Sequence, residues 1–148
     1  MTISRQNLSI VVVSFMSEKV IHNCIKSIPS DINIIIVDNS SNQVFKENIE
    51  KEYKNVQCII SPENLGMGSG NNLGLKNVKT DFAFVLNPDV VMENNTIQEI
   101  IEASKNIKSF AVIAPISNDK DYPNYKLKKK KYFVKQNMIP FKVKSVDG

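Results

Sequence analysis

Three apolar runs of the sequence each end in side chains that could bind a ligand, namely Ser14 and Phe15, Asp38 and Asn39, and Asn87 and Asp89. Their hydroxyl, amide and carboxylate groups are suited to a ribose, a phosphate or a metal ion. The competing interpretation is a turn or a helix N-cap, which Asp, Asn and Ser also favour. That interpretation stays open for Asn39, Ser40 and Ser41, whereas Asp38 and Asp89 directly follow buried runs and favour a functional role.

A glycine-rich segment lies between the second and third of these places. Residues 64–74 (NLGMGSGNNLG) contain four of the five glycines. Glycine lets a backbone approach a ligand closely, and a helix N-terminus that follows such a segment suits a diphosphate. The spacing matches neither the G-x-G-x-x-G of a dinucleotide-binding site nor the G-x-x-x-x-G-K-S/T of a P-loop. A flexible glycine turn remains the alternative.

Asp89 is the only carboxylate in the short motif Asn87-Pro88-Asp89. A carboxylate at a strand end beside a phosphate-binding loop suits Mg²⁺ or Mn²⁺, because these hard ions take oxygen ligands and share them with substrate phosphates. One carboxylate makes a sparse site, so phosphates and water would have to complete the coordination.

The elements that must position these residues alternate between strand and helix. Five strands are predicted, at Leu8–Ser14, Ile32–Val37, Val56–Ile60, Asp81–Leu86 and Phe110–Ala114. Helical patterns separate them, at Ser17–Ile28, Gln43–Tyr53, Thr96–Ile107 and, after a glycine-rich turn, within 65–78. Strands that are apolar throughout are typical of parallel sheets, and the alternation predicts an open, mostly parallel, Rossmann-like α/β sheet with helices on both faces. Ligands of such sheets bind beyond the carboxyl ends of the strands.

Composition excludes several classes of protein. The chain has 148 residues, about one domain, with 42% apolar residues and a net charge of +4. Residues 126–148 contain eight lysines and one acid, while the rest of the chain is net acidic, so the body is not a nucleic-acid-binding domain. Two cysteines and one histidine exclude a disulfide scaffold and a His-rich metal site. Cys24 and Cys58 are expected to be buried.

Location is predicted from the same residues. No apolar run reaches the roughly 18–20 residues that span a bilayer. Free thiols and the lack of an export signal favour the cytoplasm. The run Lys128–Lys131, followed by Tyr132 and Phe133, could contact an anionic membrane at its inner face, although a solvated loop is the favoured interpretation.

Four stretches in order, LSIVVVSF, IIIVDNSS, NLGMGSGNNLGL and FVLNPDV, resemble the family 2 glycosyltransferases, most of all their rhamnosyltransferase-type members. They span residues 8–91, with a looser likeness to about residue 116. The resemblance implies a GT-A fold and a nucleotide-sugar-binding domain over 1–116. The polar, lysine-rich composition of 117–148 predicts an excursion, and the alternation within Phe141–Val146 favours an edge strand there. The resemblance also implies inverting transfer from a UDP- or dTDP-sugar, including dTDP-rhamnose, to a glycan or lipid-linked acceptor in polysaccharide biosynthesis, with Mg²⁺ or Mn²⁺.

The resemblance assigns roles to individual residues. Eight are expected to contact the nucleotide-sugar: Ser14, Phe15, Asp38, Asn39, Asn64, Gly66, Asn71 and Asn87. Asp89 matches the last acid of the family's D-x-D metal motif. Asn87 departs from that motif, since it carries an amide where many members have the first carboxylate.

The family's acceptor site and general base belong to a later half that we do not find here, so the chain is predicted to be a donor-binding portion. The catalytic base stays unassigned, because Asp119, Asp121 and Asp147 do not lie in the family's base motif. A non-catalytic nucleotide or nucleotide-sugar binding module is the alternative. A nucleotidyltransferase-like enzyme would need a basic glycine-rich loop after the first strand, which Ser14–Ser17 lacks. Apolar residues Phe133, Ile139 and Phe141 predict a surface that a second copy could cover.

Overall fold

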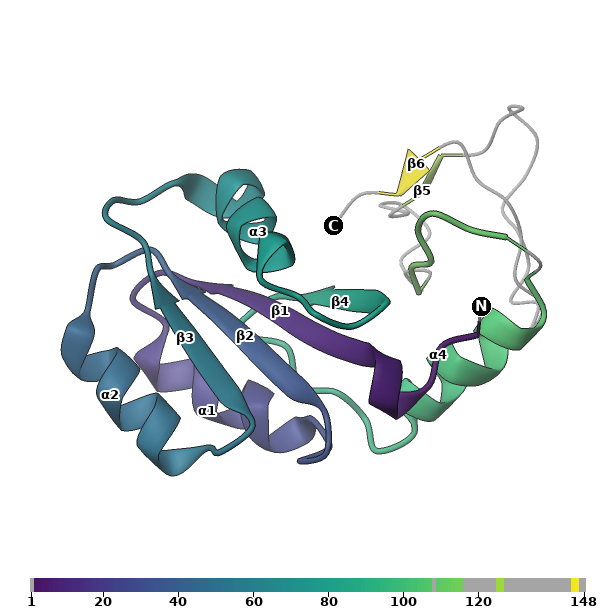
Figure 1. The fold of residues 1–148 in the computed structure, drawn as a ribbon, viewed down its shortest axis with the longest axis horizontal. Coiled ribbons are helices and arrows are strands. Elements are labelled where there is room, and N and C mark those ends of the chain that lie inside the picture. Colours follow the sequence, from purple (N-terminus) through teal and green to yellow (C-terminus); the bar gives the residue numbers. More distant parts are fainter. Residues whose placement is uncertain (1, 108, 116–124, 127–144, 147–148) are drawn as a thin grey trace. The chain divides into compact units, whose positions relative to one another are not determined.

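The computed structural model describes residues 2–107, 109–115, 125–126 and 145–146 (Figure 1). Four strands form one parallel sheet in the order β3-β2-β1-β4. They are β1 (Leu8–Ser14), β2 (Asn33–Asp38), β3 (Val56–Ile60) and β4 (Phe82–Leu86). The predicted open, parallel α/β sheet is therefore confirmed, and four of the five predicted strands lie within one residue of their expected bounds.

The two central strands form the core because they are apolar on both faces. Ile10 pairs with Ile34 and Val12 with Ile36 in the register of β1 and β2, and all four side chains are buried. Neighbouring residues of a parallel pair point to the same face, so these isoleucines and valines make one continuous apolar layer. Alternate residues, among them Val11 and Val37, supply the opposite layer, and both of these valines are buried as well.

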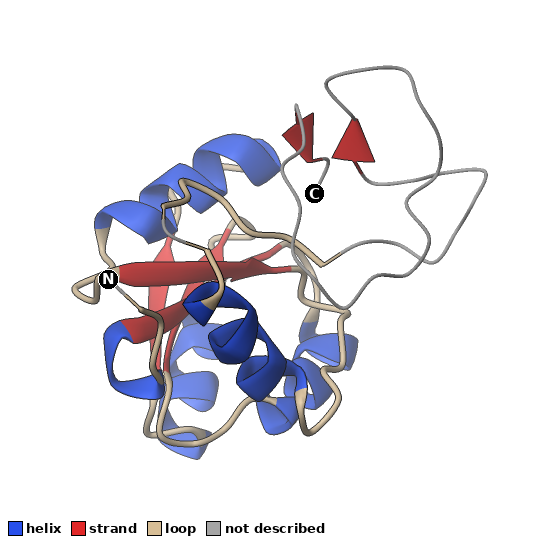
Figure 2. Cartoon of the chain, turned by 90° about the vertical axis from the view of Figure 1, so that its right-hand side faces the viewer, coloured by secondary structure: helices blue, strands red, loops and turns tan. Residues whose placement is uncertain are grey.

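Helices cover both faces of the sheet. The helices α1 (Glu18–Ser27) and α2 (Gln43–Glu52) lie on one face and α3 (Gly66–Lys76) lies on the other (Figures 1 and 2). One apolar stripe of each of the first two helices is buried, with Ile21, Cys24 and Ile25 on α1 and Phe45 and Ile49 on α2. The predicted arrangement of helices on both faces is confirmed.

The glycine-rich segment corrects one expectation. It is not a turn that leads into a helix, because α3 already begins at Gly66 and includes all four glycines of the segment. Two of them lie against the sheet. A side chain at Gly70 would meet Val13 Cγ1 at 2.9 Å, and one at Gly74 would overlap Val11 and approach Val37. Glycine is needed there because α3 packs close to the β-branched side chains of β1 and β2.

The expected fifth strand at Phe110–Ala114 is wrong, since the described residues 109–115 contain no strand. Val112 in this stretch is 70% exposed, and an apolar run becomes a strand only where another strand offers it hydrogen bonds. A short antiparallel pair, β5 (Tyr125–Lys126) with β6 (Ser145–Val146), overlaps the end of the edge strand predicted near 141–146. Lys128–Lys131 and the apolar Phe133, Ile139 and Phe141 lie outside the described residues, so their membrane and dimer roles stay predictions.

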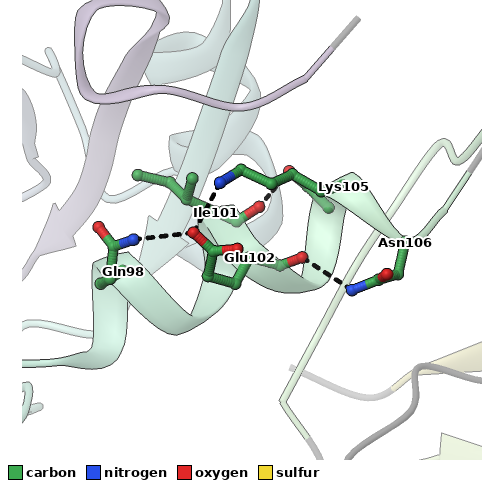
Figure 3. A network of polar contacts seen from close by, with 6 residues as sticks. Gln98, Ile101, Glu102, Lys105 and Asn106 are labelled. Carbon is green, nitrogen blue, oxygen red and sulfur yellow. Dashed lines mark hydrogen bonds and ion pairs between the residues drawn. The ribbon is translucent and has the colours of Figure 1, made fainter.

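The chain divides into two compact units, essentially residues 3–97 and 98–148. Helix α4 (Thr96–Lys105) carries a polar network on its own surface (Figure 3). The Glu102 carboxylate accepts from Gln98 at 3.0 Å and from Lys105 at 2.6 Å, and its backbone carbonyl accepts from Asn106 at 3.1 Å. Among the described residues, no helix is long and apolar enough to cross a membrane.

Replacing Gly74 by alanine tests the close packing of α3. The new methyl group would overlap Val11, so we expect Gly74→Ala to lower the free energy of unfolding by about 1–3 kcal/mol. Gly68→Ala is the matched control, because nothing lies within 4 Å of its added carbon. It should raise stability by roughly 0.5–1 kcal/mol through helix propensity. Urea unfolding of both variants measures the difference, and equal effects would contradict the packing argument.

Candidate functional site

The carboxyl ends of β1, β2 and β4 lie at one edge of the sheet. Ser14 and Asp38 are register partners, and the Asn39 N–H donates to the Ser14 carbonyl at 2.8 Å. Leu86, the last residue of β4, pairs with Val12, so Asn87 follows directly beside the end of β1. The sheet thus gathers the polar residues that the sequence places after three separate strands.

The Asp38 carboxylate organises the loop between β2 and α2. It is only 1% exposed. One oxygen accepts from the Ser40 N–H at 3.3 Å and from the Ser40 hydroxyl at 2.7 Å, and the other accepts from the Asn42 N–H at 2.8 Å. Asn42 in turn is the N-cap of α2, since its side chain accepts from the Phe45 N–H at 3.0 Å. Asp38 therefore holds the loop in shape, and its contact with a nucleoside stays a prediction.

Two serines that the sequence did not single out for this role tie two loops together. The Ser41 hydroxyl donates to the Ser61 carbonyl at 2.6 Å, and the Ser61 hydroxyl donates to the Glu63 carbonyl at 2.5 Å. Ser41 has a φ of 56°, a left-handed conformation that costs free energy in a residue other than glycine. The loop after β2 is thereby anchored to the loop after β3. The only sequence signal was the Asn-Ser-Ser-Asn run, which is typical of turns.

Asn39 joins the end of β2 to the start of α3. Its side-chain N–H donates to the Gly66 carbonyl at 3.1 Å, and it is 3% exposed. Gly66 has a φ of 70°, and its own N–H donates to the Asn64 side chain at 2.9 Å. The Asn39 Oδ1 has no partner, and a buried acceptor without one costs about 1–3 kcal/mol. An amide oxygen left in this state at the ligand end of a sheet is available to a donor that enters.

The loop after β1 presents an apolar pair of side chains. Phe15 is 47% exposed beside the buried Ser14, and Met16 has a φ of 51°. Ser17 holds this turn, because its hydroxyl donates to the Phe15 carbonyl at 3.2 Å. Met16 also lines an open surface pocket of about 470 Å³ with Ser41 and Val44, so the two non-glycine residues of the described chain that have a left-handed backbone border the same pocket. Such strain often marks functional loops.

The third part of the site is the loop after β4. Asn87 and Asp89 are both exposed, and the Asn87 carbonyl accepts from the Val90 N–H at 3.2 Å and the Cys24 thiol at 3.6 Å. No group of three or more His, Cys, Asp or Glu side chains gathers anywhere in the described part of the chain. The exposed carboxylate of Asp89 fits Mg²⁺ or Mn²⁺ in chemistry, as one oxygen ligand that phosphates and water must supplement.

The remaining expected site residues lie on α3 and the loop before it. Asn64 is exposed and Asn71 is half-buried in the helix. Asn64 is joined to the site through Gly66, whereas within the described residues no hydrogen bond connects the Asn71 side chain to the strand ends. The structure therefore brings together Ser14, Asp38, Asn39, Asn64 and Gly66 by hydrogen bonds, with Phe15 and Asn87 beside them.

Both cysteines are buried, as the sequence predicts. Burial raises the pKa of the Cys24 thiol from 9.0 to about 11, with the negative charge of Asp89 as a second cause. Burial likewise raises the pKa of Cys58 to about 12, followed by the charge of Asp38. His22 is half-buried on α1, and its Nδ1 lies 2.9 Å from the Tyr53 hydroxyl, so it takes part in the contact between α1 and the end of α2.

The sequence is similar to those of known glycosyltransferases. The family model described as glycosyl transferase family 2 matches residues 9–147. The low-salt glycan biosynthesis hexosyltransferase Agl10 of Haloferax volcanii is 27% identical over 113 residues. That alignment covers 74% of this chain and 36% of the relative, so the chain spans little more than a third of that protein's length.

The fold is similar to several solved glycosyltransferases. The S. aureus TarS 1-349 structure in complex with UDP has a TM-score of 0.55 and 23% identity, over 63% of this chain and 30% of that one. The mannosyltransferase PcManGT from Pyrobaculum calidifontis, in complex with GDP-Man and Mn²⁺, has a TM-score of 0.56 and 13% identity, over 64% and 31%. At this identity the likeness concerns the fold alone, and it confirms the expected GT-A type.

Removing the Asp38 carboxylate tests its role in the loop. Asp38→Ala leaves the N–H groups of Ser40 and Asn42 without their acceptor, so we expect a loss of about 1–3 kcal/mol in unfolding free energy. Asp31→Ala is the control, because Asp31 makes only an exposed ion pair with Arg5 at 3.4 Å. That pair is worth about 0–1 kcal/mol. Chemical denaturation followed by circular dichroism would refute the role if both variants lost the same stability.

The raised pKa of Cys58 predicts a loss of stability in alkali. Its pKa in the folded protein lies above the ordinary 9.0, so its contribution is complete below about pH 9 and is lost as the pH rises toward 12. We expect the unfolding free energy of the wild type to fall more steeply between pH 9 and 11 than that of Cys58→Ala. The slopes are compared, because the substitution itself also costs packing. Parallel slopes would show that Cys58 does not contribute.

Proposed function

The chain belongs to glycosyl transferase family 2, and from that premise we propose that it binds the nucleoside diphosphate of a nucleotide-sugar donor. The carrying observation is the hydrogen-bonded edge at which β1, β2 and α3 meet, with Asn39 joined to both Ser14 and Gly66. Two solved structures of similar fold support the ligand class, since one holds UDP and the other GDP-Man with Mn²⁺.

Different residues around this edge are proposed to bind different parts of the nucleotide-sugar. Phe15 offers an exposed ring on which a base can stack, and Ser14 lies behind it at the end of β1. The Asn39 Oδ1 offers an acceptor to a donor group of the nucleoside. The N-terminus of α3 offers N–H groups and the positive end of the helix dipole to a diphosphate. Asn64 fixes this terminus through its bond to the Gly66 N–H at 2.9 Å.

Asp89 is the proposed ligand of Mg²⁺ or Mn²⁺. When such an ion is bound, it neutralises charge that develops on the leaving diphosphate. Asp89 would supply one carboxylate oxygen to the ion. Asn87 has a neutral amide at a position where a second carboxylate would repel the diphosphate. The exposed position of both residues leaves room for phosphate oxygens and water beside them.

The finer proposal is inverting transfer from a UDP- or dTDP-sugar, dTDP-rhamnose among them, to a glycan or lipid-linked acceptor. The similarity to a glycan biosynthesis hexosyltransferase supports a glycan product. The acceptor site and the general base are assigned to none of the described residues. A cytoplasmic location completes the proposal, with Lys128–Lys131 as a solvated loop that could also contact an anionic membrane.

Nucleotide titrations test the donor site and the metal ligand together. UDP, dTDP and GDP are titrated by calorimetry into the folded chain, with and without Mg²⁺ or Mn²⁺. We expect UDP or dTDP to bind and the ion to strengthen binding. Asp89→Asn should remove that strengthening and lower the affinity for the ion by about tenfold or more. Substituting residues that only hydrogen-bond to metal ligands already changes metal affinity about 10–100-fold.

Asp81→Asn is the matched control, since Asp81 is an exposed acid that precedes β4 at the opposite end of the strand. It should leave the effect of the ion unchanged. Absence of any binding at millimolar nucleotide would overturn the donor site. A preference for GDP would overturn the choice of base, and full metal dependence in Asp89→Asn would assign the ion to another acid.

A further inference from the structure

Among the strands that the structure describes, β3 forms one edge of the sheet, and half of its backbone groups face away from β2. The Ile34 N–H donates to the Asn55 carbonyl at 2.8 Å and the Ser61 N–H donates to the Asp38 carbonyl at 2.9 Å, so residues 55 and 61 face β2. Alternate residues of a parallel strand face alternate sides, which turns the N–H and C=O of Val56, Cys58 and Ile60 outward. An open edge of this kind can pair with another strand.

Two charged side chains of α2 occupy the central outward position. The Cys58 N–H donates to the Glu50 carboxylate at 2.7 Å, and the Lys46 ammonium donates to the Cys58 carbonyl at 2.6 Å. The two side chains also form an ion pair at 3.6 Å and are only 31% and 33% exposed. One acceptor and one donor thus take the places that a neighbouring strand would fill, and charge-assisted bonds of this kind are about twice as strong as neutral ones.

We propose that the Lys46–Glu50 pair closes this edge against the same edge of a second copy of the chain. A strand whose central residue has both groups free is self-complementary. In an antiparallel pair related by a two-fold axis, Cys58 of each copy would exchange both hydrogen bonds with the other, and Val56 would lie opposite Ile60. The pair must release Cys58 before such a contact can form, and the Val56 N–H is already held by the Tyr53 carbonyl at 3.2 Å.

Closing the edge explains why Lys46 and Glu50 are partly desolvated, which costs free energy that an ordinary surface ion pair does not lose. A solvent-exposed pair at i, i+4 adds little to stability. Lys46 and Glu50 instead reach past the helix surface to the backbone of another element, and both are partly withdrawn from water. The neighbouring bond on the same helix, from Gln43 to Glu47 at 3.0 Å, is exposed and reaches no strand, which makes it the natural control.

Hydrogen exchange at the Cys58 amide tests the contact. In Glu50→Ala this amide should exchange roughly tenfold faster or more, because the bond to a charged acceptor is lost. Glu50→Gln keeps an acceptor oxygen and should retain most of the protection. Glu47→Ala should leave it unchanged. Wild-type protection of Cys58 in folded Glu50→Ala would overturn the proposal.

Self-association tests the consequence. Sedimentation of Lys46→Met/Glu50→Leu should show a dimer whose population grows with concentration, while the Cys58 amide regains protection as the dimer forms. Gln43→Met/Glu47→Leu adds similar apolar surface to the same helix and should not dimerise. A folded monomer in the first variant, or equal association of both, would overturn the proposal. If the first variant does not fold, sedimentation of folded Glu50→Ala is measured against concentration instead. A dimer would then support the proposal, and a monomer would overturn it.

Discussion

The closeness of α3 to the sheet is the constraint on which the rest of the site depends. Gly74 and Gly70 lie where any side chain would strike Val11 or Val13, so the helix rests almost directly on the two central strands. This short distance between helix and sheet also sets how far the first turn of α3 lies from the strand ends. Gly66 consequently reaches the Asn39 side chain at the end of β2. A helix held further from the sheet by ordinary side chains would break that link, and the two loops would lose their common anchor.

Polar groups at this edge are mostly consumed in holding the loops. The side chains of Asp38, Ser41 and Ser61 form hydrogen bonds within the same region, mostly to backbone groups. All these bonds are between 2.5 and 3.3 Å long. Such a network fixes loop positions before a ligand arrives, which lowers the entropy that binding must overcome. The Asn39 Oδ1 is the exception, because it is buried without a partner. An unsatisfied acceptor within an otherwise satisfied network is where an added donor gains most.

The β3 edge illustrates a different use of charge. Lys46 and Glu50 have the spacing of a common surface pair on a helix, and nothing in their sequence distinguishes them from Gln43 and Glu47. Their bonds to Cys58 arise because α2 lies beside β3 on its face of the sheet. The same side chains therefore hold the helix to the strand and occupy the strand's outward groups.

The amino-acid sequence by itself determined the parallel sheet and the ends of its strands. Runs such as Leu8–Ser14 and Val56–Ile60 are defined by their local content of apolar, mostly β-branched residues, and both strands have the predicted bounds. It also indicated which polar residues would gather, because the carboxyl ends of parallel strands share one edge. The stretch Phe110–Ala114 shows the limit of that reasoning, since local composition contains no information about whether a partner strand is present.

Only the tertiary structure decided what the polar residues do. The glycines of residues 64–74 suggest a ligand loop, yet two of them serve the contact between α3 and the valines of β1 and β2, residues more than 30 positions away in the chain. The sequence places Asp38 at a strand end without saying what it contacts, and in the structure its carboxylate accepts from the Ser40 and Asn42 N–H groups of its own loop. Distances between segments remote in sequence set these roles, and a pattern of residue types does not contain such distances.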